Sequence, residues 1–340
     1  MRVAFAIADK PAARFIETVR AEGQCKNFWF LRSDGSLDLI PMPGATEAEI
    51  ALFRASREAD AAVAEDSSEI GELAAAVAGR LKSRAPAELV RQIDVIIVCT
   101  TGIDSPIGVS MAGKIKHIFA APQAFSFTIA QMDGCSVFEA LRIARAFMHG
   151  PERARVVAVV SSERWWYPYF RSFGDYAQYG DGAAAMLLCG PDTVPAMDGA
   201  DTGIEIVDVA LERYQGQHGP FDLQSPPWYR SENWPQAVGE FIAGFLRKHV
   251  LSAADLADTR SPCLDAAFIA AVACAADVRL SPGSGGFVSS VDPMLGFDAT
   301  ADDDDVRGLV LSWSVGLNGE MGVCLYRRGD ALQAPTRKAN

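Results

Sequence analysis

Cys135 is the residue of this sequence whose type and position best suit covalent chemistry. It ends the segment 131-QMDGC-135, follows a predicted buried strand over 125–130, and opens an amphipathic helical pattern over 136–149. The start of a helix offers free backbone N–H groups and the positive end of the dipole, which stabilise a thiolate and lower the pKa of a thiol. Such a thiolate can attack a thioester, and the same N–H groups can hold the oxyanion that forms. The segment alone leaves open that Cys135 is a buried structural thiol.

A general base for this thiol has few sources, because the sequence contains only four histidines. His218 is the candidate base, and it lies in the long loop 212–234; an exposed loop histidine is the alternative. Loops of this length in a compact protein are usually lids or binding walls. The other three are expected away from the thiol: His117 at the start of a strand, His249 at the surface, and His149 at the far end of the helix, roughly 20 Å along its axis.

The elements that would position these residues alternate along the chain, which is typical of α/β layers. Short, nearly continuous apolar runs rich in β-branched residues predict strands covered on both faces, over residues 4–8, 93–101, 125–130, 155–162, 183–190, 204–211, 308–313 and 322–327. Apolar residues at helical spacing predict helices over 67–90 as far as Pro86, 136–149 and 235–250.

Composition excludes several classes of function. The 340 residues include 31 basic and 43 acidic ones, for a formal net charge of −12, which disfavours binding to nucleic acids or to anionic membranes. The longest apolar run, Ala266 to Ala276, is shorter than the roughly 20 residues that span a bilayer. The apolar stretch in MRVAFAIADKP is too short for a secretion signal, so none is expected. The seven cysteines form no CxxC pair, so we expect a cytoplasmic protein with reduced thiols and no metal site.

Three further segments join the Cys135 segment in an ordered pattern. They are the strand 93-IDVIIVCTT-101, the stretch from Ser162-Glu163 to 180-GDGAA-184, and 308-GLVLSWSVGLNGEMGVCLYR-327. In this order they resemble the thiolase superfamily, and within it the branch of β-ketoacyl-ACP synthase III and its acyltransferase relatives. Members of that branch show "IDLIIVATST", "ACSGF.YAL..A", "SE", "GDGAGA" and "GFGGGLTWGA" at the matching places. The resemblance covers residues 67–327.

The resemblance implies an α/β fold of the thiolase-like five-layer αβαβα type, made of two similar halves. The first half, residues 1–195, would carry the nucleophile cysteine, residues 196–330 would form the second, and 331–340 a flexible tail. It also implies an acyl-cysteine intermediate on Cys135, loaded from acyl-CoA or an acyl carrier protein, with no permanently bound cofactor. The oxyanion hole would be formed by the backbone N–H groups of Cys135 and Gly316. A dimer is expected, with a second copy or with a related chain.

The sequence departs from the condensing members of this branch at two catalytic groups. Those members carry a His in "HQAN" and an Asn in "GNTSSAS", which together promote malonyl decarboxylation. Here Pro262 or Cys263 falls nearest the His position and Ser284 nearest the Asn position, and no histidine follows His249. The early "TRTGI" segment, whose Arg helps to hold coenzyme A, also has no clear counterpart. Because an enolate needs such donors, decarboxylative condensation is expected to be slow or absent. Simple acyl transfer needs only a thiolate, an oxyanion hole and one general base.

Several other residues are candidates for contact with substrate. Trp165 and Trp166 begin an aromatic cluster that predicts either a pocket wall or an interface. Arg142, on the helix after Cys135, is a candidate contact for coenzyme A phosphates or an acidic carrier protein, with a solvated helix face as the alternative. Asp181, between two glycines, is expected to act as a turn residue rather than a catalytic acid.

These features together predict a thioester-dependent acyltransferase of fatty-acid-like or specialised metabolism, which does not decarboxylate malonyl groups. Two alternatives stay open. The first is a non-catalytic or half-catalytic partner subunit of a heteromeric ketosynthase III-like enzyme. The second is an atypical 3-oxoacyl-ACP synthase III, with a substituted base.

Overall fold

The computed structural model describes residues 1–9, 29–31, 37–39, 69–102, 110–150, 153–164, 172–173, 177–190, 204–214, 233–280, 287–297, 306–316 and 318–329. Its strands are β1 (Arg2–Asp9), β2 (Trp29–Leu31), β3 (Leu37–Leu39), β4 (Ile93–Thr100), β5 (Phe125–Ala130), β6 (Val156–Glu163), β7 (Ser172–Phe173), β8 (Ala177–Gln178), β9 (Gly182–Cys189), β10 (Ile204–Arg213), β11 (Leu256–Arg260), β12 (Gly308–Val315) and β13 (Glu320–Arg328). Its helices are α3 (Ile70–Arg84), α4 (Ala87–Arg91), α5 (Met111–Phe119), α6 (Cys135–His149), α7 (Asn233–Lys248), α8 (Ala266–Ala276) and α9 (Asp292–Leu295), with short 3₁₀ turns η3 (Ala253–Asp255) and η4 (Ser289–Val291).

Nine of these strands form one hydrogen-bonded sheet in the order β11-β12-β13-β10-β1-β9-β6-β4-β5. In its N-terminal half, β4 lies parallel to β5 and β6, whereas β9 and β1 run antiparallel to their neighbours. The C-terminal half has the same pattern, because β11 and β12 are parallel and β13 and β10 are antiparallel to their neighbours. The halves meet where Arg2 and Val3 of β1 pair with Glu205 and Ile204 of β10.

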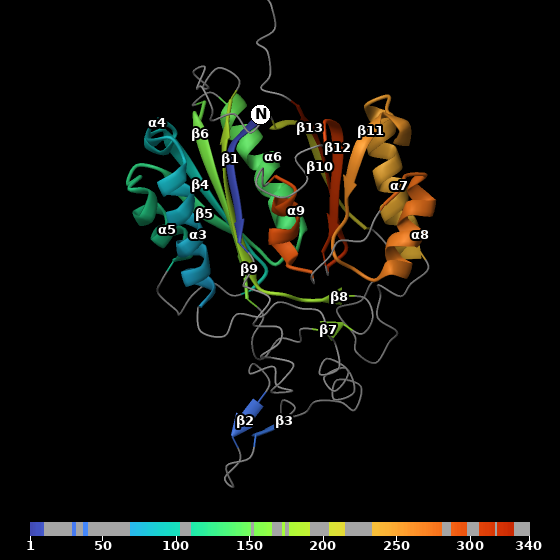
Figure 1. Cartoon of the computed structure of the whole chain (residues 1–340), viewed down its shortest axis with the longest axis horizontal. Coiled ribbons are helices and arrows are strands. Elements are labelled where there is room, and N and C mark those ends of the chain that lie inside the picture. Colours follow the sequence, from blue (N-terminus) through green and yellow to red (C-terminus); the bar gives the residue numbers. More distant parts are fainter. Residues whose placement is uncertain are drawn as a thin grey trace, which may run out of the picture.

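The two half-sheets face each other across a central layer of helices, as Figure 1 shows. α6 and α9 lie in this central layer, α3 and α5 cover the outer face of the N-terminal half-sheet, and α7 and α8 cover the outer face of the C-terminal one (Figure 1). A separate cluster of buried apolar residues fills each of the three helix-bearing layers. This is the five-layer αβαβα arrangement of two similar halves that the resemblance predicts.

The division between the halves falls in an undescribed part of the chain. β9, which ends at Cys189, belongs to the N-terminal half-sheet, and β10, which begins at Ile204, belongs to the C-terminal one. The predicted boundary after residue 195 and the predicted tail over 331–340 lie outside the described residues, so both stay predictions.

α6 is the helix that Cys135 opens, and its sequence accounts for its ends and its burial. It begins directly after Gly134 and ends at His149; Gly150 and Pro151 follow, and a proline cannot continue a helix. One stripe of the helix is buried in the central layer, where it packs against both half-sheets. The buried residues are Cys135, Ser136, Val137, Phe138, Ala140, Leu141, Ala144 and Met148.

The predicted strands and helices are present except for a strand at His117, and the structure adds elements that the patterns missed. The strand expected at His117 is wrong, because His117 lies exposed in the last turn of α5. The Ser110 side chain caps this helix by accepting a hydrogen bond from the Gly113 N–H at 3.2 Å. The sequence pattern did not predict α8, because this helix is uniformly apolar and lacks the polar face that marks helical periodicity.

Asp208 of β10 connects the helices on the two sides of the C-terminal half-sheet. Its carboxylate lies 2.8 Å from Arg145 Nη1 of α6 and 2.9 Å from both Lys248 Nζ of α7 and His249 Nε2. Burial alone would raise the pKa of Asp208, but hydrogen bonds from Lys248, Val209 and His249 hold that pKa below its usual value. His249 was expected at the surface; it is instead partly buried by this contact.

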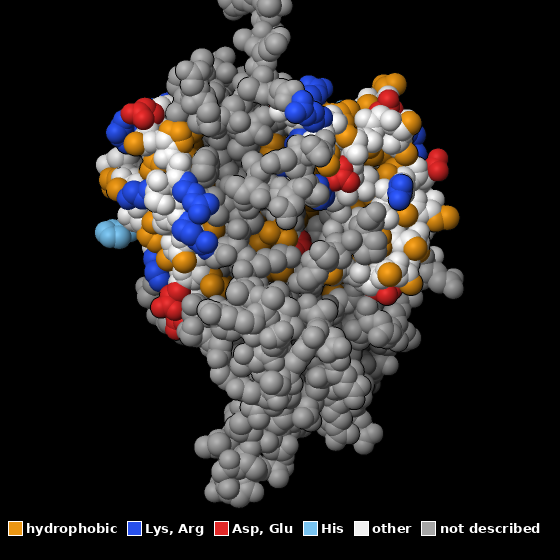
Figure 2. All heavy atoms as spheres, viewed as in Figure 1, with side chains coloured by type: hydrophobic (Ala, Val, Ile, Leu, Met, Phe, Trp, Pro, Cys, Tyr) orange, Lys and Arg blue, Asp and Glu red, His pale blue; other side chains and the backbone are white. Residues whose placement is uncertain are grey.

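The described surface mixes charge types. Lys, Arg, Asp and Glu side chains lie over the outer helices on both sides of the face seen in Figure 2, with hydrophobic side chains scattered among them. Among the residues that the structure describes, no helix is both long enough and apolar enough to cross a membrane.

Substitution by alanine at two glycines of α7 should change the stability of the fold in opposite directions. A Cβ at Gly239 would collide with the Ala275 Cβ and lie 2.9 Å from the Ala275 carbonyl carbon, so Gly239→Ala should cost about 1–3 kcal/mol by forcing α7 from α8. Gly244 has only Arg247 Nη2 near such a Cβ, at 3.7 Å, so Gly244→Ala should add about 0.5–1 kcal/mol. Urea unfolding of both variants measures this, and a stabilised Gly239→Ala would contradict the packing of α7 on α8.

Candidate active site around Cys135

The Cys135 thiol lies fully buried between the first turn of α6 and the hairpin of β12 and β13. Its S–H donates to the Ser314 carbonyl oxygen at 3.5 Å, and the Gly322 N–H donates to the sulfur. Ser314 and Gly322 are cross-strand partners in this hairpin. The site therefore combines a residue of the N-terminal half with backbone groups of the C-terminal half.

Three glycines allow this close approach. A Cβ at Gly134 would collide with the Ser314 side chain, and one at Gly322 would collide with the ring of Phe138. At Gly316 a Cβ would lie 2.5 Å from Glu320 Oε2 and 2.9 Å from the Met132 carbonyl oxygen. The structure thus brings Gly316 against the turn that precedes Cys135, as expected if both serve one site.

The turn before Cys135 is conformationally strained. Gln131 has a φ of 65° and Asp133 a φ of 44°, values that side-chain-bearing residues rarely adopt. The Asn318 side chain holds this turn from the hairpin, by donating from Nδ2 to the Gln131 carbonyl oxygen at 3.1 Å. Such strain persists only where the surroundings over-determine it, and it concentrates at functional sites.

The two N–H groups predicted to form the oxyanion hole are both engaged in this structure. The Cys135 N–H donates to the Met132 carbonyl oxygen at 2.9 Å, and the Gly316 N–H donates to the Glu320 carbonyl oxygen at 2.9 Å. A substrate oxygen would have to share or replace these bonds. Among the described residues, the buried hydroxyls of Ser136 and Ser314 have no hydrogen-bond partner.

The pKa of the Cys135 thiol is shifted in the opposite direction to the one that the helix terminus alone predicts. Burial raises the pKa of this thiol well above its usual value, and the carboxylates of Glu320 and Asp133 raise it further, whereas the Gly322 hydrogen bond opposes them weakly. The expected lowering of the pKa is therefore wrong for this structure. The thiol is protonated at neutral pH, so reaction requires a group that removes its proton.

Next to the thiol lies a buried polar network that the sequence did not reveal. Glu163, at the end of β6, accepts hydrogen bonds from the Thr101 N–H at 2.9 Å and from the hydroxyl and N–H of Ser290. Ser289 donates to Asp133 Oδ1 at 3.1 Å and also contacts the Thr101 hydroxyl. The network joins β4, β6, η4 and the Cys135 turn, which are far apart in the sequence. The only sequence signal was the Ser162-Glu163 motif at a strand end.

The remaining predicted site residues are either undescribed or turn away from the thiol. His218, Trp165 and Trp166 lie outside the described residues, so their roles stay predictions. Arg142 is exposed, and its Nη1 lies 2.9 Å from Glu139 on the same helix, as the solvated-face alternative predicts. His149 ends α6 as expected, at the end opposite Cys135.

The positions of the absent His and Asn hold groups without comparable chemistry. Pro262 is buried, and Cys263 is partly buried and donates its N–H to Asp292 Oδ2 at 3.4 Å. Ser284 lies outside the described residues. The tandem Ser289-Ser290 offers a better register for "GNTSSAS", which places Phe287 at the Asn position. Phe287 is buried against Tyr179, with ring centroids 5.2 Å apart.

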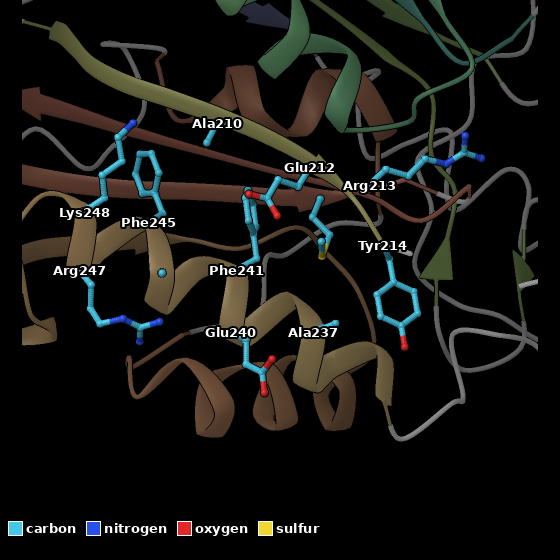
Figure 3. A pocket seen from close by; sticks show the side chains of 12 residues that line it. Ala210, Glu212, Arg213, Tyr214, Ala237, Glu240, Phe241, Phe245, Arg247 and Lys248 are labelled. Atoms are coloured by element: carbon cyan, nitrogen blue, oxygen red, sulfur yellow. The ribbon is translucent and has the colours of Figure 1, made fainter. Parts of the chain in front are cut away.

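A groove of about 830 Å³ lies on the other face of the C-terminal half-sheet, between β10 and α7. Figure 3 shows Phe241 and Phe245 extending from α7 toward β10, and Glu240, Arg247 and Lys248 are the charged residues that α7 adds to the lining. Its lining is Ala210, Glu212, Arg213, Tyr214, Ala237, Glu240, Phe241, Gly244, Phe245, Arg247, Lys248 and Met321. The groove reaches the active-site hairpin from outside, because the Tyr214 N–H donates to the Gly319 carbonyl oxygen at 2.8 Å.

Glu163 should make the stability of the fold depend on pH. Burial raises the pKa of Glu163 to about 8, from 4.5, against the hydrogen bonds from Ser290 and Thr101 that lower it. Between these values the folded chain keeps a proton that the unfolded chain has released, so the free energy of unfolding falls as pH rises, by up to roughly 1.4 kcal/mol per pH unit. Glu163→Gln should flatten this decline between about pH 5 and 8 in thermal unfolding. Exposed Glu88→Gln is the control, and a Glu163→Gln slope equal to wild type would contradict the raised pKa of Glu163.

Comparison with known proteins finds the fold in solved structures alone. No family model and no curated protein sequence matches the chain. ChlB3, described as an acyltransferase, superposes with a TM-score of 0.69 at 13% identity, over 96% of this chain and 97% of that one. An OleA variant from Xanthomonas campestris with bound lauric acid and lauroyl-CoA gives 0.66 at 10% identity, over 96% and 98%. The β-ketoacyl-[acyl carrier protein] synthase III from Thermus thermophilus gives 0.64 at 15% identity, over 97% and 100%.

These structures cover nearly the whole chain and share its layers and its two halves. At such low identity the likeness concerns the fold, and it agrees with the ordered motifs around Cys135. The chain has the thiolase-like fold that these solved structures share.

Proposed function

We propose that this chain is a thioester-dependent acyltransferase that carries its acyl group on Cys135. The observation that carries the proposal is the position of the Cys135 sulfur, at the start of α6 and against the hairpin that holds Gly316. A cysteine packed for structure alone needs neither the strained turn before it nor carboxylates beside it. Acyl-CoA or an acyl carrier protein is the proposed donor, and no permanently bound cofactor is required.

The acceptor chemistry follows from what the site lacks. Decarboxylation of a malonyl group builds negative charge on an enolate oxygen, which needs neutral or positive donors. Neither Pro262 nor Cys263 supplies an imidazole at the His position, and both registers of the later motif lack the Asn. Transfer of an acyl group to a hydroxyl or amine avoids the enolate, and it needs a nucleophile, an oxyanion site and one base. The acyltransferase description of ChlB3 supports this class, and the lauroyl-CoA bound to OleA supports an acyl-CoA as donor.

A partner-subunit role is the second candidate, because two observations favour it. The Cys135 thiol has a raised pKa, and the N–H groups of Cys135 and Gly316 are already hydrogen bonded. In this case a related chain with the intact His and Asn would do the chemistry. An atypical condensing enzyme is the third candidate, supported by the likeness to AbyA1, described as a tetronic acid condensing enzyme, at a TM-score of 0.59 and 13% identity.

Intact-protein mass spectrometry tests the proposed function directly. Incubation with a panel of acyl-CoA and acyl-carrier thioesters should add the mass of one acyl group, and Cys135→Ala should abolish the addition. The exposed Cys274 supplies the control, since Cys274→Ala should still be acylated. Malonyl thioesters should release no CO₂. If no donor labels the wild-type chain until a related chain is added, the partner-subunit role replaces the proposal.

We also propose that the chain pairs with a second copy through β5. β5 is the last strand of the nine-stranded sheet, so one of its edges has no neighbouring strand among the described residues. Phe125 at its start is 59% exposed, and its ring lies 5.4 Å from that of Phe127 and 6.0 Å from that of Phe147. An open apolar edge invites another strand, and the same edge on a two-fold-related copy pairs with it antiparallel.

Phe125→Glu should shift the chain towards monomer, because it places a charge on the proposed interface. Val250→Glu is the matched control: Val250 is 92% exposed, but it follows α7 on the other half of the molecule. Sedimentation velocity of the three proteins at equal concentration measures the effect. A Phe125→Glu chain with the wild-type sedimentation coefficient would place the interface elsewhere, and a monomeric wild type that associates only with a related chain would indicate a heterodimer.

A further inference from the structure

Glu320 is a buried carboxylate that the predicted mechanism leaves without a role. It begins β13 and is 8% exposed. Successive side chains of a strand point to opposite faces, so Glu320 lies on the same face of β13 as Gly322, two residues on. That face receives α6, because the Phe138 ring packs on Gly322 and the Gly322 N–H donates to the Cys135 sulfur. Glu320 therefore faces the helix start that carries the thiol.

The hairpin turn fixes the carboxylate of Glu320 against the nucleophile turn. A Cβ on Gly316 would lie 2.5 Å from Glu320 Oε2 and 2.9 Å from the Met132 carbonyl oxygen. These two oxygens therefore lie on either side of the same small space next to the Gly316 Cα. Only glycine leaves this space open. The Asn318 N–H donates to the same Oε2 at 3.1 Å, while the Asn318 side chain holds Gln131. One turn thus positions the carboxylate and the residues before Cys135 together.

From this arrangement we propose that Glu320 is the general base and acid of acyl transfer at Cys135. The proposal deepens the proposed function and rests on it. During loading, the proton of the Cys135 thiol passes to the Glu320 carboxylate as the sulfur bonds to the acyl carbon. The bond from that carbon to the donor sulfur breaks, and the leaving thiolate takes the proton.

The second half-reaction runs by the same exchange. The acceptor hydroxyl or amine gives its proton to Glu320 while its oxygen or nitrogen bonds to the acyl carbon. The bond to Cys135 Sγ then breaks, and Glu320 returns the proton to that sulfur. A protonated leaving sulfur matters here, because the environment of Cys135 disfavours a free thiolate. No oxidant or further reactant is needed in either step.

Asp133 is the other carboxylate beside the thiol, and its place suits it to a different task. Its backbone forms the strained turn with a φ of 44°, and its Oδ1 accepts the Ser289 hydroxyl within the Glu163 network. It is therefore tied to the buried network, whereas Glu320 is held by the hairpin. The titratable groups that face Cys135 are thus Glu320 from β13 and Asp133 from the preceding turn.

Glu320→Gln is the decisive variant, because glutamine keeps the acceptor for the Asn318 N–H and loses the base. Turnover of acyl transfer should fall about 10²–10⁴-fold, and Glu320→Asp, which keeps a carboxylate, should fall less. Glu212→Gln is the matched control: Glu212 is exposed on β10, lines the groove on the outer face, and should leave turnover unchanged (Figure 3). Glu320→Gln turnover within twofold of wild type overturns the proposal.

The pH dependence of Cys135 alkylation by iodoacetamide, followed by peptide mass spectrometry, separates a base from a structural group. Removing the negative charge of Glu320 should move the alkylation midpoint to lower pH, so the thiol becomes easier to ionise while transfer becomes slower. Slower alkylation of Cys135 together with slower transfer and a lowered midpoint of thermal unfolding would assign Glu320 to structure and overturn the proposal. If Glu320→Gln does not fold, the same pair of readouts on Glu320→Ala decides, and wild-type-like transfer in that variant overturns the proposal. A wild-type chain that accepts no acyl group under any condition overturns the proposed function itself, whatever the alkylation midpoints show.

Discussion

The structure around Cys135 depends on how closely the start of α6 can approach the β12–β13 hairpin. Gly134 and Gly322 remove the side chains that would otherwise separate the two surfaces, and Gly316 does the same where the hairpin turns. The nucleophile belongs to one half of the fold and the hairpin to the other, so this contact also fixes how the halves pack. A methyl group at any of the three positions would widen the site and the interface between the halves together.

That close approach determines the chemistry available to the thiol. It removes water from the sulfur and places the carboxylates of Glu320 and Asp133 beside it, and both effects disfavour the thiolate. An enolate would meet the same two negative charges, and no histidine follows His249 to supply a donor. Acyl transfer through a neutral thiol and a nearby base avoids both penalties. The electrostatics and the absent His and Asn therefore point to the same class of reaction.

Sequence patterns predicted what depends on local periodicity and left out what depends on distant contacts. The buried strands, α6 and the position of Cys135 at its start follow from runs of neighbouring residues. The direction of the Cys135 pKa shift does not, since it comes first from burial of the thiol and then from Glu320, which lies 185 positions further along the chain; both act only after folding. The Glu163 network likewise joins Thr101, Asp133 and Ser290, whose polar side chains looked ordinary in isolation. α8 was missed because helix and buried strand look alike in an unbroken apolar run.

The energetic cost of Glu320 bears on the choice between an enzyme and an inactive subunit. A carboxylate that is 8% exposed loses the hydration energy that it has in water. The hydrogen bond that it accepts from the Asn318 N–H restores only part of that energy. A neutral side chain such as glutamine would keep that bond and pack in similar space without the charge. The fold thus carries a destabilising group against a thiol, next to a strained turn. Groups that lower the stability of the fold in this way are expected where a site performs chemistry. A subunit needed only for its interface would gain nothing from them.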